Sequence, residues 1–186
     1  EEIAIDLENL EDTFLALRSQ EFVIDRELQL QRYRDQIKPD IIWNTELGLE
    51  QSTSTLAKAE RARAALYAQF NDLFSQYDLI VTPGANTPAF DVELRFPEAI
   101  NGIKLEHYMA ASTLTAAVTI SASPALSLPC GFDQYGRPIG LQLIGRPRGE
   151  AALLAAGALF EVESGLAEQV PIDPRHGKVP PIGKLI

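Results

Sequence analysis

The chain has 186 residues, of which 46% are hydrophobic, so length and composition predict one domain with a sizeable core. Twenty-six acidic residues against sixteen basic ones give a net charge of −10, which repels phosphate backbones and anionic lipid surfaces. We therefore expect no nucleic acid and no membrane as a partner, and no apolar run approaches the roughly 20 residues that span a bilayer.

The first 77 residues predict helices in series, because no glycine precedes Gly48 and Pro39 is the only proline among them. Two short helices are expected before Pro39. The second should end just ahead of the proline, whose ring disfavours helical backbone in the residue before it. The apolar positions of these two helices are Leu7, Leu10, Phe14, Leu17 and Phe22, then Leu28, Leu30, Tyr33 and Ile37. A longer helix is expected over 54–76, where apolar residues recur at steps of three and four.

The apolar run at 79–81 predicts a short strand that is buried on both faces and ends at Pro83. Residues 85–106 have no sustained period and predict a long surface loop, and loops of this length are often functional. A helix rich in alanine and threonine is then expected over 107–120, followed by a strand over 125–129.

Residues 133–136, Asp-Gln-Tyr-Gly, suit a type I turn, so the strand over 125–129 and the alternating residues 139–143 predict a hairpin. A closing helix is expected from Gly149 to Phe160. Its predicted inward face consists of Ala151, Leu154, Ala155, Ala158, Leu159 and Val162. Four prolines after residue 170 predict an extended tail. The sequence thus predicts three parts: a helical segment 1–77, a strand, hairpin and helix segment 78–165, and a proline-rich tail 166–186.

Three runs of residues carry a family resemblance. Residues 123–132 read Ser-Pro-Ala-Leu-Ser-Leu-Pro-Cys-Gly-Phe, residues 136–146 read Gly-Arg-Pro-Ile-Gly-Leu-Gln-Leu-Ile-Gly-Arg, and residues 77–83 read Tyr-Asp-Leu-Ile-Val-Thr-Pro. In this order they resemble the C-terminal part of an amidase-signature hydrolase, an enzyme that hydrolyses carboxamides. The resemblance implies an α/β fold in which 78–165 form part of a mixed sheet flanked by helices. All three predicted parts would then belong to one larger amidase domain.

The resemblance places the catalytic machinery outside these residues. The family's Ser–Ser–Lys set lies in the other half of its chains, where a lysine precedes a Gly-Gly-Ser-Ser run, and this sequence has no adjacent glycines. The chain also begins at Glu1 and has a single methionine, Met109, which suggests that an upstream segment is missing. We therefore expect no catalytic residue here, no activity in the chain alone, and a catalytic half supplied by the same protein or by a separate chain.

Hydroxyl-bearing residues ahead of the hairpin are the candidate substrate contacts. Ser112 and Thr115 lie on the predicted helix 107–120, and the resemblance implies that they face the substrate. The alternative is that they bond to backbone carbonyls within the helix. Thr82 and Pro83 end a predicted strand, and α/β sheets bind ligands beyond the carboxyl ends of their strands. These four residues are the predicted substrate-binding site.

Two departures from the family pattern bear on the substrate. Thr119 and Ala122 stand where the family usually has Asn and Gly, which leaves the range of amides open. Glutamine-using amidotransferase subunits of the family carry an acidic residue at the place of Ser112. The resemblance therefore favours an amidohydrolase over the A-type subunit of a glutamine amidotransferase, which stays an alternative. A non-catalytic binding or assembly subunit is another, because a partial sheet leaves an open edge, and a homodimer is an open possibility.

Other chemistry has weaker support in the sequence. Cys130 could act as a nucleophile with His107 or His176, but its Leu-Pro-Cys-Gly-Phe context predicts a buried and inert thiol. A single cysteine forms no internal disulfide, which favours a reducing, cytoplasmic setting. The two histidines lack the spacing of a metal motif, so neither metal nor cofactor is expected. Arginines near the hairpin, Arg137 among them, are candidates for binding an anionic group, although solvated side chains are the commoner outcome there.

Overall fold

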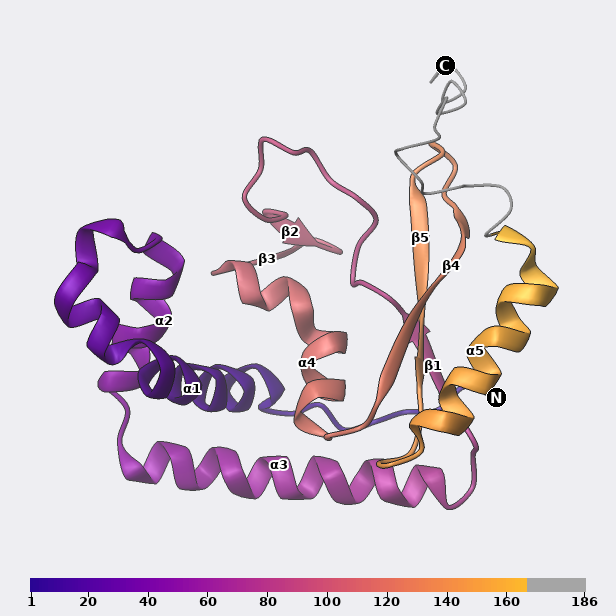
Figure 1. The fold of residues 1–186 in the computed structure, drawn as a ribbon, viewed down its shortest axis with the longest axis horizontal. Helices are drawn as coiled ribbons and strands as arrows, with labels where there is room; N and C mark the ends of the chain where they lie inside the picture. The colour runs from indigo at the N-terminus through magenta and orange to yellow at the C-terminus, as the bar shows by residue number, and fades with distance from the viewer. Residues whose placement is uncertain (167–186) are drawn as a thin grey trace. The chain divides into compact units, whose positions relative to one another are not determined.

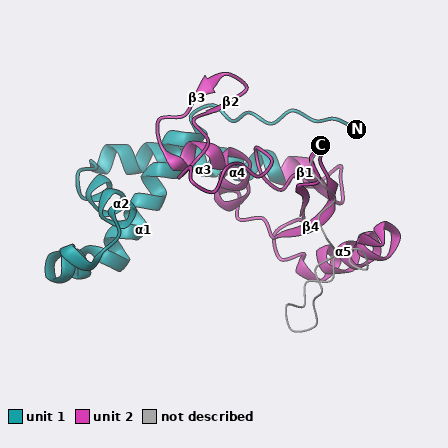
Figure 2. Cartoon of the chain, turned by 90° about the horizontal axis from the view of Figure 1, so that it is seen from above, with its two compact units in different colours: residues 1–70 teal, residues 71–186 magenta. Residues whose placement is uncertain are grey.

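The computed structural model describes residues 1–166 of the chain. The predicted tail, apart from residue 166, lies outside the described residues. The chain divides into two compact units, residues 1–70 and 71–186 (Figure 2). Within the described part, no helix combines the length and the apolar character that a membrane crossing requires.

Helix α1, Leu10–Tyr33, is one continuous helix of 24 residues (Figure 1). The prediction of two short helices over this region is therefore wrong. Its buried face begins with Leu10, Thr13, Ala16 and Ser19, so small and polar side chains carry the stripe that an apolar pattern misses. The pattern of large apolar residues is interrupted within 10–33, but no glycine or proline is present there to break the helix.

Pro39 ends one segment and begins another. A short 3-10 helix, Arg34–Gln36, stops before it, and α2, Pro39–Leu49, starts with the proline at its first position, where the missing N–H costs nothing. The sequence pattern did not single out α2. Helix α2 approaches α1 at Gly48, where an added Cβ would collide with the backbone carbonyl of Ser19. Only glycine allows this close approach.

Helix α3, Thr53–Phe74, lies within two residues of its predicted range. Ala59, Leu66 and Phe70 from the predicted stripe are buried. Arg63 lies on the exposed side, where it pairs with Glu60 at 2.7 Å. The boundary between the two units falls in the last turn of this helix.

Unit 2 contains a three-stranded antiparallel sheet in the order β1-β5-β4. Its strands are β1, Ile80–Pro83, β4, Ala125–Phe132, and β5, Pro138–Ile144. The predicted hairpin of β4 and β5 is confirmed, with the turn closed by a hydrogen bond from Gly136 N to Asp133 O at 3.0 Å. The prediction that β1 is buried on both faces is wrong, because Val81 is 54% exposed. Among the described residues β1 is an edge strand, and one face of it has no cover.

The segment predicted as a loop over 85–106 contains a small hairpin. Its strands are β2, Ala99–Ile100, and β3, Ile103–Lys104. Asn101 and Gly102 form the turn with φ of 50° and 78°, the backbone that an Asn-Gly pair adopts readily. This turn signal was visible in the sequence, but the strands are too short to show a period. The helix predicted over 107–120 is a 3-10 helix, Tyr108–Ser112, followed by α4, Thr113–Ile120.

Helix α5, Glu150–Ser164, packs on the sheet, and in both views the sheet lies between α5 and α4 (Figures 1 and 2). The core of this packing is Leu128, Leu143 and Leu153. The predicted inward face is wrong, since Leu154, Leu159 and Val162 are 60%, 69% and 78% exposed. The sequence of α5 is apolar on both sides, so its periodicity could not identify the face that meets the sheet. The buried face is that of Leu153 and Gly157.

Candidate functional site

A hollow of about 730 Å³ lies in unit 2, where β1 ends and β5 begins. Four segments line it: the loop that follows β1, the 3-10 helix that precedes α4, the first residues of β5, and β4 through Ser127. The loop residues reach it at 83–90 and 95–97, and Tyr108, Ala111 and Ser112 come from the 3-10 helix. The hollow therefore lies at the carboxyl end of β1 and at the amino end of the antiparallel β5.

Backbone forms one part of the lining. Gly84 N donates a hydrogen bond to Gly140 O at 2.8 Å, which carries the pairing of β1 and β5 one residue beyond Pro83. A Cβ added at Gly84 would lie 3.2 Å from the carbonyl carbon and oxygen of Gly140. This approach is tighter than most Cβ contacts, so a larger residue at position 84 would require Gly140 to shift.

The structure brings two of the four predicted substrate contacts to the hollow. Pro83 and Ser112 line it, whereas Thr82 and Thr115 are absent from its lining residues. Thr82 Oγ1 accepts a hydrogen bond from Gln142 Nε2 at 3.1 Å, across the β1–β5 pair. Thr115 Oγ1 donates to the backbone carbonyl of Ser112 at 3.0 Å, which is the bonding within the helix that the sequence left as an alternative.

Aromatic side chains in the lining were not singled out from the sequence. Phe90 and Phe96 come from the loop, and Tyr108 comes from the 3-10 helix. Phe90 is 48% exposed, although an aromatic side chain of this size is usually covered. The length of the loop was the one signal that pointed to it, because its prolines and phenylalanines follow neither a helix nor a strand period.

The turn of the β4–β5 hairpin reaches the loop through Arg137. Its Nη1 donates to Ala89 O at 2.6 Å, and its Nε donates to Asp133 Oδ2 at 2.6 Å. Desolvation acts to raise the pKa of Asp133, but hydrogen bonds from the backbone and guanidinium of Arg137 and from the backbone N–H of Tyr135 outweigh it, so the pKa lies below its ordinary value. The carboxylate thus stays charged and fixes the guanidinium.

Cys130 is exposed, so the prediction of a buried thiol is wrong. The register of β4 against β5 shifts between Pro129 and Gly131, which leaves Cys130 as the extra residue of a bulge without a cross-strand partner. His176 lies outside the described residues. Among the residues that the structure does describe, no group of three His, Cys, Asp or Glu side chains is placed to hold a metal ion.

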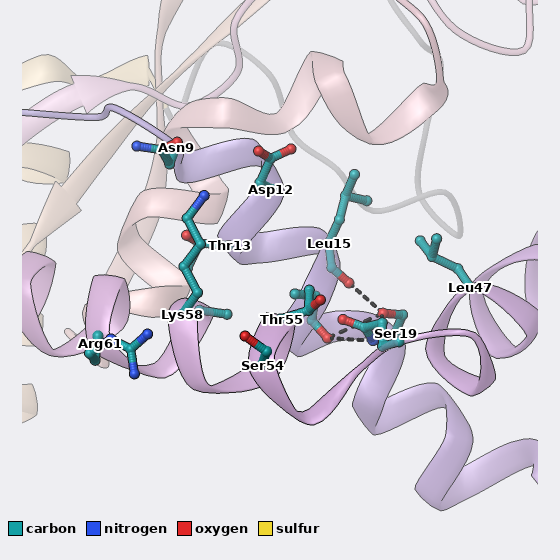
Figure 3. Close-up of a pocket in the computed structure, with 13 residues that line it drawn as sticks. Asn9, Asp12, Thr13, Leu15, Ser19, Leu47, Ser54, Thr55, Lys58 and Arg61 are labelled. Atoms are coloured by element: carbon teal, nitrogen blue, oxygen red, sulfur yellow. Dashed lines mark hydrogen bonds between the residues drawn. The ribbon is translucent and has the colours of Figure 1, made fainter.

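A second hollow, of about 520 Å³, lies in unit 1 between residues of α1 and α3. In Figure 3, Lys58 from α3 extends toward Asn9 and Asp12 at the start of α1. Deeper in this hollow the fully buried Ser19 donates to Leu15 O at 2.7 Å and accepts a bond from Gln51 Nε2 at 2.7 Å. The hydrogen bond between Ser19 and Gln51 helps to hold the helices of unit 1 together. None of the predicted site residues lines this second hollow.

Comparison with known proteins gives one consistent result. The sequence model of the family described as Amidase matches residues 24–154. The chain is 34% identical over 171 residues to the A-type subunit of glutamyl-tRNA(Gln) amidotransferase from Levilactobacillus brevis, and 30% identical over 168 residues to that from Streptococcus mutans. Each match covers 90% of this chain and 31% of the relative. The chain therefore spans about a third of the length of these relatives.

Solved structures show the same fold. A crystal structure of an amidase matches with a TM-score of 0.79 and 24% identity, over 89% of this chain and 38% of that one. A bacterial aryl acylamidase of the amidase-signature family matches with a TM-score of 0.74 and 20% identity, over 89% of this chain and 36% of that one. At these identities the likeness concerns the fold alone.

Proposed function

Because the chain belongs to the amidase-signature family, we propose that it is part of an amidohydrolase, which converts a carboxamide and water into a carboxylate and ammonia or an amine. The hollow beyond β1 is the observation that carries this proposal. Its volume of about 730 Å³ falls among small-molecule sites, which measure roughly 300–1,000 Å³. Aromatic side chains, a few hydroxyl groups and backbone line it, and Arg95 is the one charged side chain among the described lining residues.

In this proposal the chain forms a wall of the substrate pocket, and the Ser–Ser–Lys set implied by the resemblance comes from the rest of the protein or from a separate chain. Loss of the nucleophile of a serine hydrolase lowers kcat by about 10⁶. We therefore propose that the 186 residues alone hydrolyse no amide at a measurable rate. The proposed setting is the cytoplasm.

The four predicted contacts have different proposed roles. Ser112 and Pro83 line the hollow and would touch the substrate directly. Thr82 would act through Gln142, because the Thr82 hydroxyl group accepts a hydrogen bond from the Gln142 side-chain amide. Thr115 would act through the backbone of Ser112, because its hydroxyl group already donates to that carbonyl.

The test is the release of ammonia by the complete protein from a panel of carboxamides that differ in size, charge and aromatic content. Exchange of Ser112→Ala should raise KM for the preferred amide. Ser75→Ala is the matched control, since Ser75 Oγ donates to Asp72 O on an exposed helix end outside the hollow. Absence of turnover over the whole panel would refute the proposal, and equal kinetics of the two variants would remove Ser112 from the site.

A second candidate is the A-type subunit of a glutamine amidotransferase, and the names of the curated relatives favour it. Such a protein would release ammonia from glutamine and pass it to an acceptor. Glutamine belongs in the panel for this reason. A kcat/KM for glutamine far above that of every other amide would favour this candidate, whereas glutamine at background beside an efficient simple amide would exclude it. A protein that hydrolyses neither would leave the non-catalytic assembly role.

A further inference from the structure

The loop between β1 and β2 presents apolar groups to the hollow without packing them into a core. Phe90 is 48% exposed, and Phe96 and Pro88 line the same hollow from the loop. Ile139 and Ala111 face the hollow from β5 and the 3-10 helix. An exposed ring in a concave, mostly apolar site gains free energy when a ligand covers it.

The charges of the lining limit what this ligand carries. Arg95 is the one charged side chain among the described residues of the lining, and its guanidinium lies 5.7 Å from the ring centre of Tyr108. Within residues 1–166 no carboxylate lines the hollow, so an ammonium group placed there would lose its water without gaining a counter-ion from them. The described lining therefore disfavours a positively charged group in the part of a substrate that enters this hollow.

We propose that this loop is the specificity wall of the amidase, that it binds an aromatic or similarly flat apolar group of the amide, and that Arg137 is the positioning residue that holds it. The inference rests on the proposed amide substrate and narrows its class. Arg137 acts through the loop and touches no reacting atom.

The contacts of Arg137 carry this assignment. Its guanidinium bonds to Ala89 O, one residue before Phe90, at 2.6 Å, and this bond joins positions 48 residues apart. The same guanidinium is fixed by Asp133 at 2.6 Å and lies 5.1 Å from the ring centre of Tyr135. Asp133 in turn accepts hydrogen bonds from the backbone N–H groups of Tyr135 and Arg137, each at 2.9 Å. The loop is thus tied, next to its most exposed aromatic residue, to a hairpin turn that is itself closed by hydrogen bonds.

Other bonds tie the loop farther from Phe90. Gly84 is joined to β5, and Asn86 Oδ1 accepts a hydrogen bond from Leu114 N at the start of α4 at 3.3 Å. Loss of the Arg137 bond would therefore leave the base of the loop in place and free the part that carries Phe90. The expected effect is weaker binding of the group that Phe90 covers, and a much smaller effect on an amide too small to reach it.

The experiment measures kcat and KM of the complete protein for phenylacetamide and for acetamide. The wild type should prefer phenylacetamide, and Arg137→Gln and Phe90→Ala should each lower the ratio of kcat/KM between the two amides by about five- to tenfold, mainly through KM. Arg137→Lys should restore little of this ratio, because one ammonium group cannot reproduce a fork that bonds to Ala89 and Asp133 together. Arg63→Gln, which removes an arginine from an exposed ion pair in α3, is the matched control and should keep the ratio of the wild type.

The outcomes separate this inference from the proposed function. Hydrolysis without preference for phenylacetamide, or a ratio that Arg137→Gln leaves intact, would overturn the inference and keep the amidase. If no amide is hydrolysed, calorimetric binding of phenylacetamide to the complete protein decides the question. If Phe90→Ala and Arg137→Gln weaken this binding, the proposed role of the loop stands and the proposed amide hydrolysis does not. If phenylacetamide does not bind at all, both proposals are overturned.

Discussion

Two neighbouring leucines of α5 give a sharp test of the packing. Leu153 is 3% exposed and lies in the core with Leu128 and Leu143, whereas Leu154 is 60% exposed. Truncation of a buried leucine to alanine costs about 2–5 kcal/mol, and the part above the transfer free energy reflects the cavity that remains. The neighbours of Leu153 lie on paired strands that cannot collapse into the gap, so we expect Leu153→Ala to cost about 3–4 kcal/mol.

Leu154→Ala removes a side chain that is mostly in water already, and alanine is the better helix former, so the expected change lies within about 0.5 kcal/mol. The assay is urea unfolding of the 186-residue chain, monitored by circular dichroism, with the free energy of unfolding compared at a constant m-value. The two variants share helix, chemistry and removed volume, and only the face differs. Equal losses, or a larger loss for Leu154→Ala, would refute the assigned face of α5.

Three further changes test other parts of the structure. Gly48→Ala should destabilise unit 1 by about 1–3 kcal/mol in urea unfolding, because the clash with the Ser19 carbonyl exceeds the gain in helix propensity of about 1 kcal/mol. Gly157→Ala is the control and should be near neutral, because the added methyl group meets only the flexible end of the Leu126 side chain. Equal losses of stability in the two variants would contradict this reasoning. Thr82→Val should cost about 1–3 kcal/mol, because the buried Gln142 loses its acceptor, and Thr82→Ser should restore most of it; a valine variant as stable as the wild type would exclude that role. The pKa of Asp133 is lowered on folding, so its stabilisation is present above the ordinary value of 3.8 and is lost as pH falls through the folded value. The stability gap between wild type and Asp133→Asn should therefore narrow as the pH falls below 3.8, and a gap that widens over that range would contradict the sign.

The hairpin and the third helix were predictable because their signals are local. Residues 133–136 have the composition of a type I turn, and the structure closes it with the expected hydrogen bond to Asp133 O. The stripe of α3 places Ala59, Leu66 and Phe70 in the core at the predicted spacing. In both elements the residues that decide the structure are close together in the sequence.

The errors arise where the deciding contact is distant in the sequence. Helix α1 is buried through small residues such as Ser19, which a pattern of large apolar residues passes over. The buried face of α5 is that of Leu153 and Gly157, and it is identified by contact with β4, where Leu126 lies against Gly157. The exposure of Cys130 depends on a bulge in its pairing with β5. Each of these needs the tertiary partner to be known.

The predicted site residues coincide only in part with the lining of the hollow. The end of a strand before a long loop indicated the region, and Pro83 and Ser112 line the hollow found there. The aromatic lining and its contact with Arg137 were not predictable. The hydrogen bond from Arg137 to Ala89 O joins the hairpin turn to a loop whose sequence has no helix or strand period.

The most direct test of the account fills the hollow in the complete protein. Ala111 lines it, so Ala111→Trp should occupy the space of the substrate, and Ala65→Trp on the exposed side of α3 is the matched control. We predict that the wild type and Ala65→Trp release ammonia from the preferred amide, and that Ala111→Trp loses at least about tenfold in kcat/KM, since a loss of about 1.4 kcal/mol in binding already gives that factor. A fully active Ala111→Trp, or a wild type that hydrolyses no amide, would contradict the assignment of this hollow as the substrate pocket of an amidase.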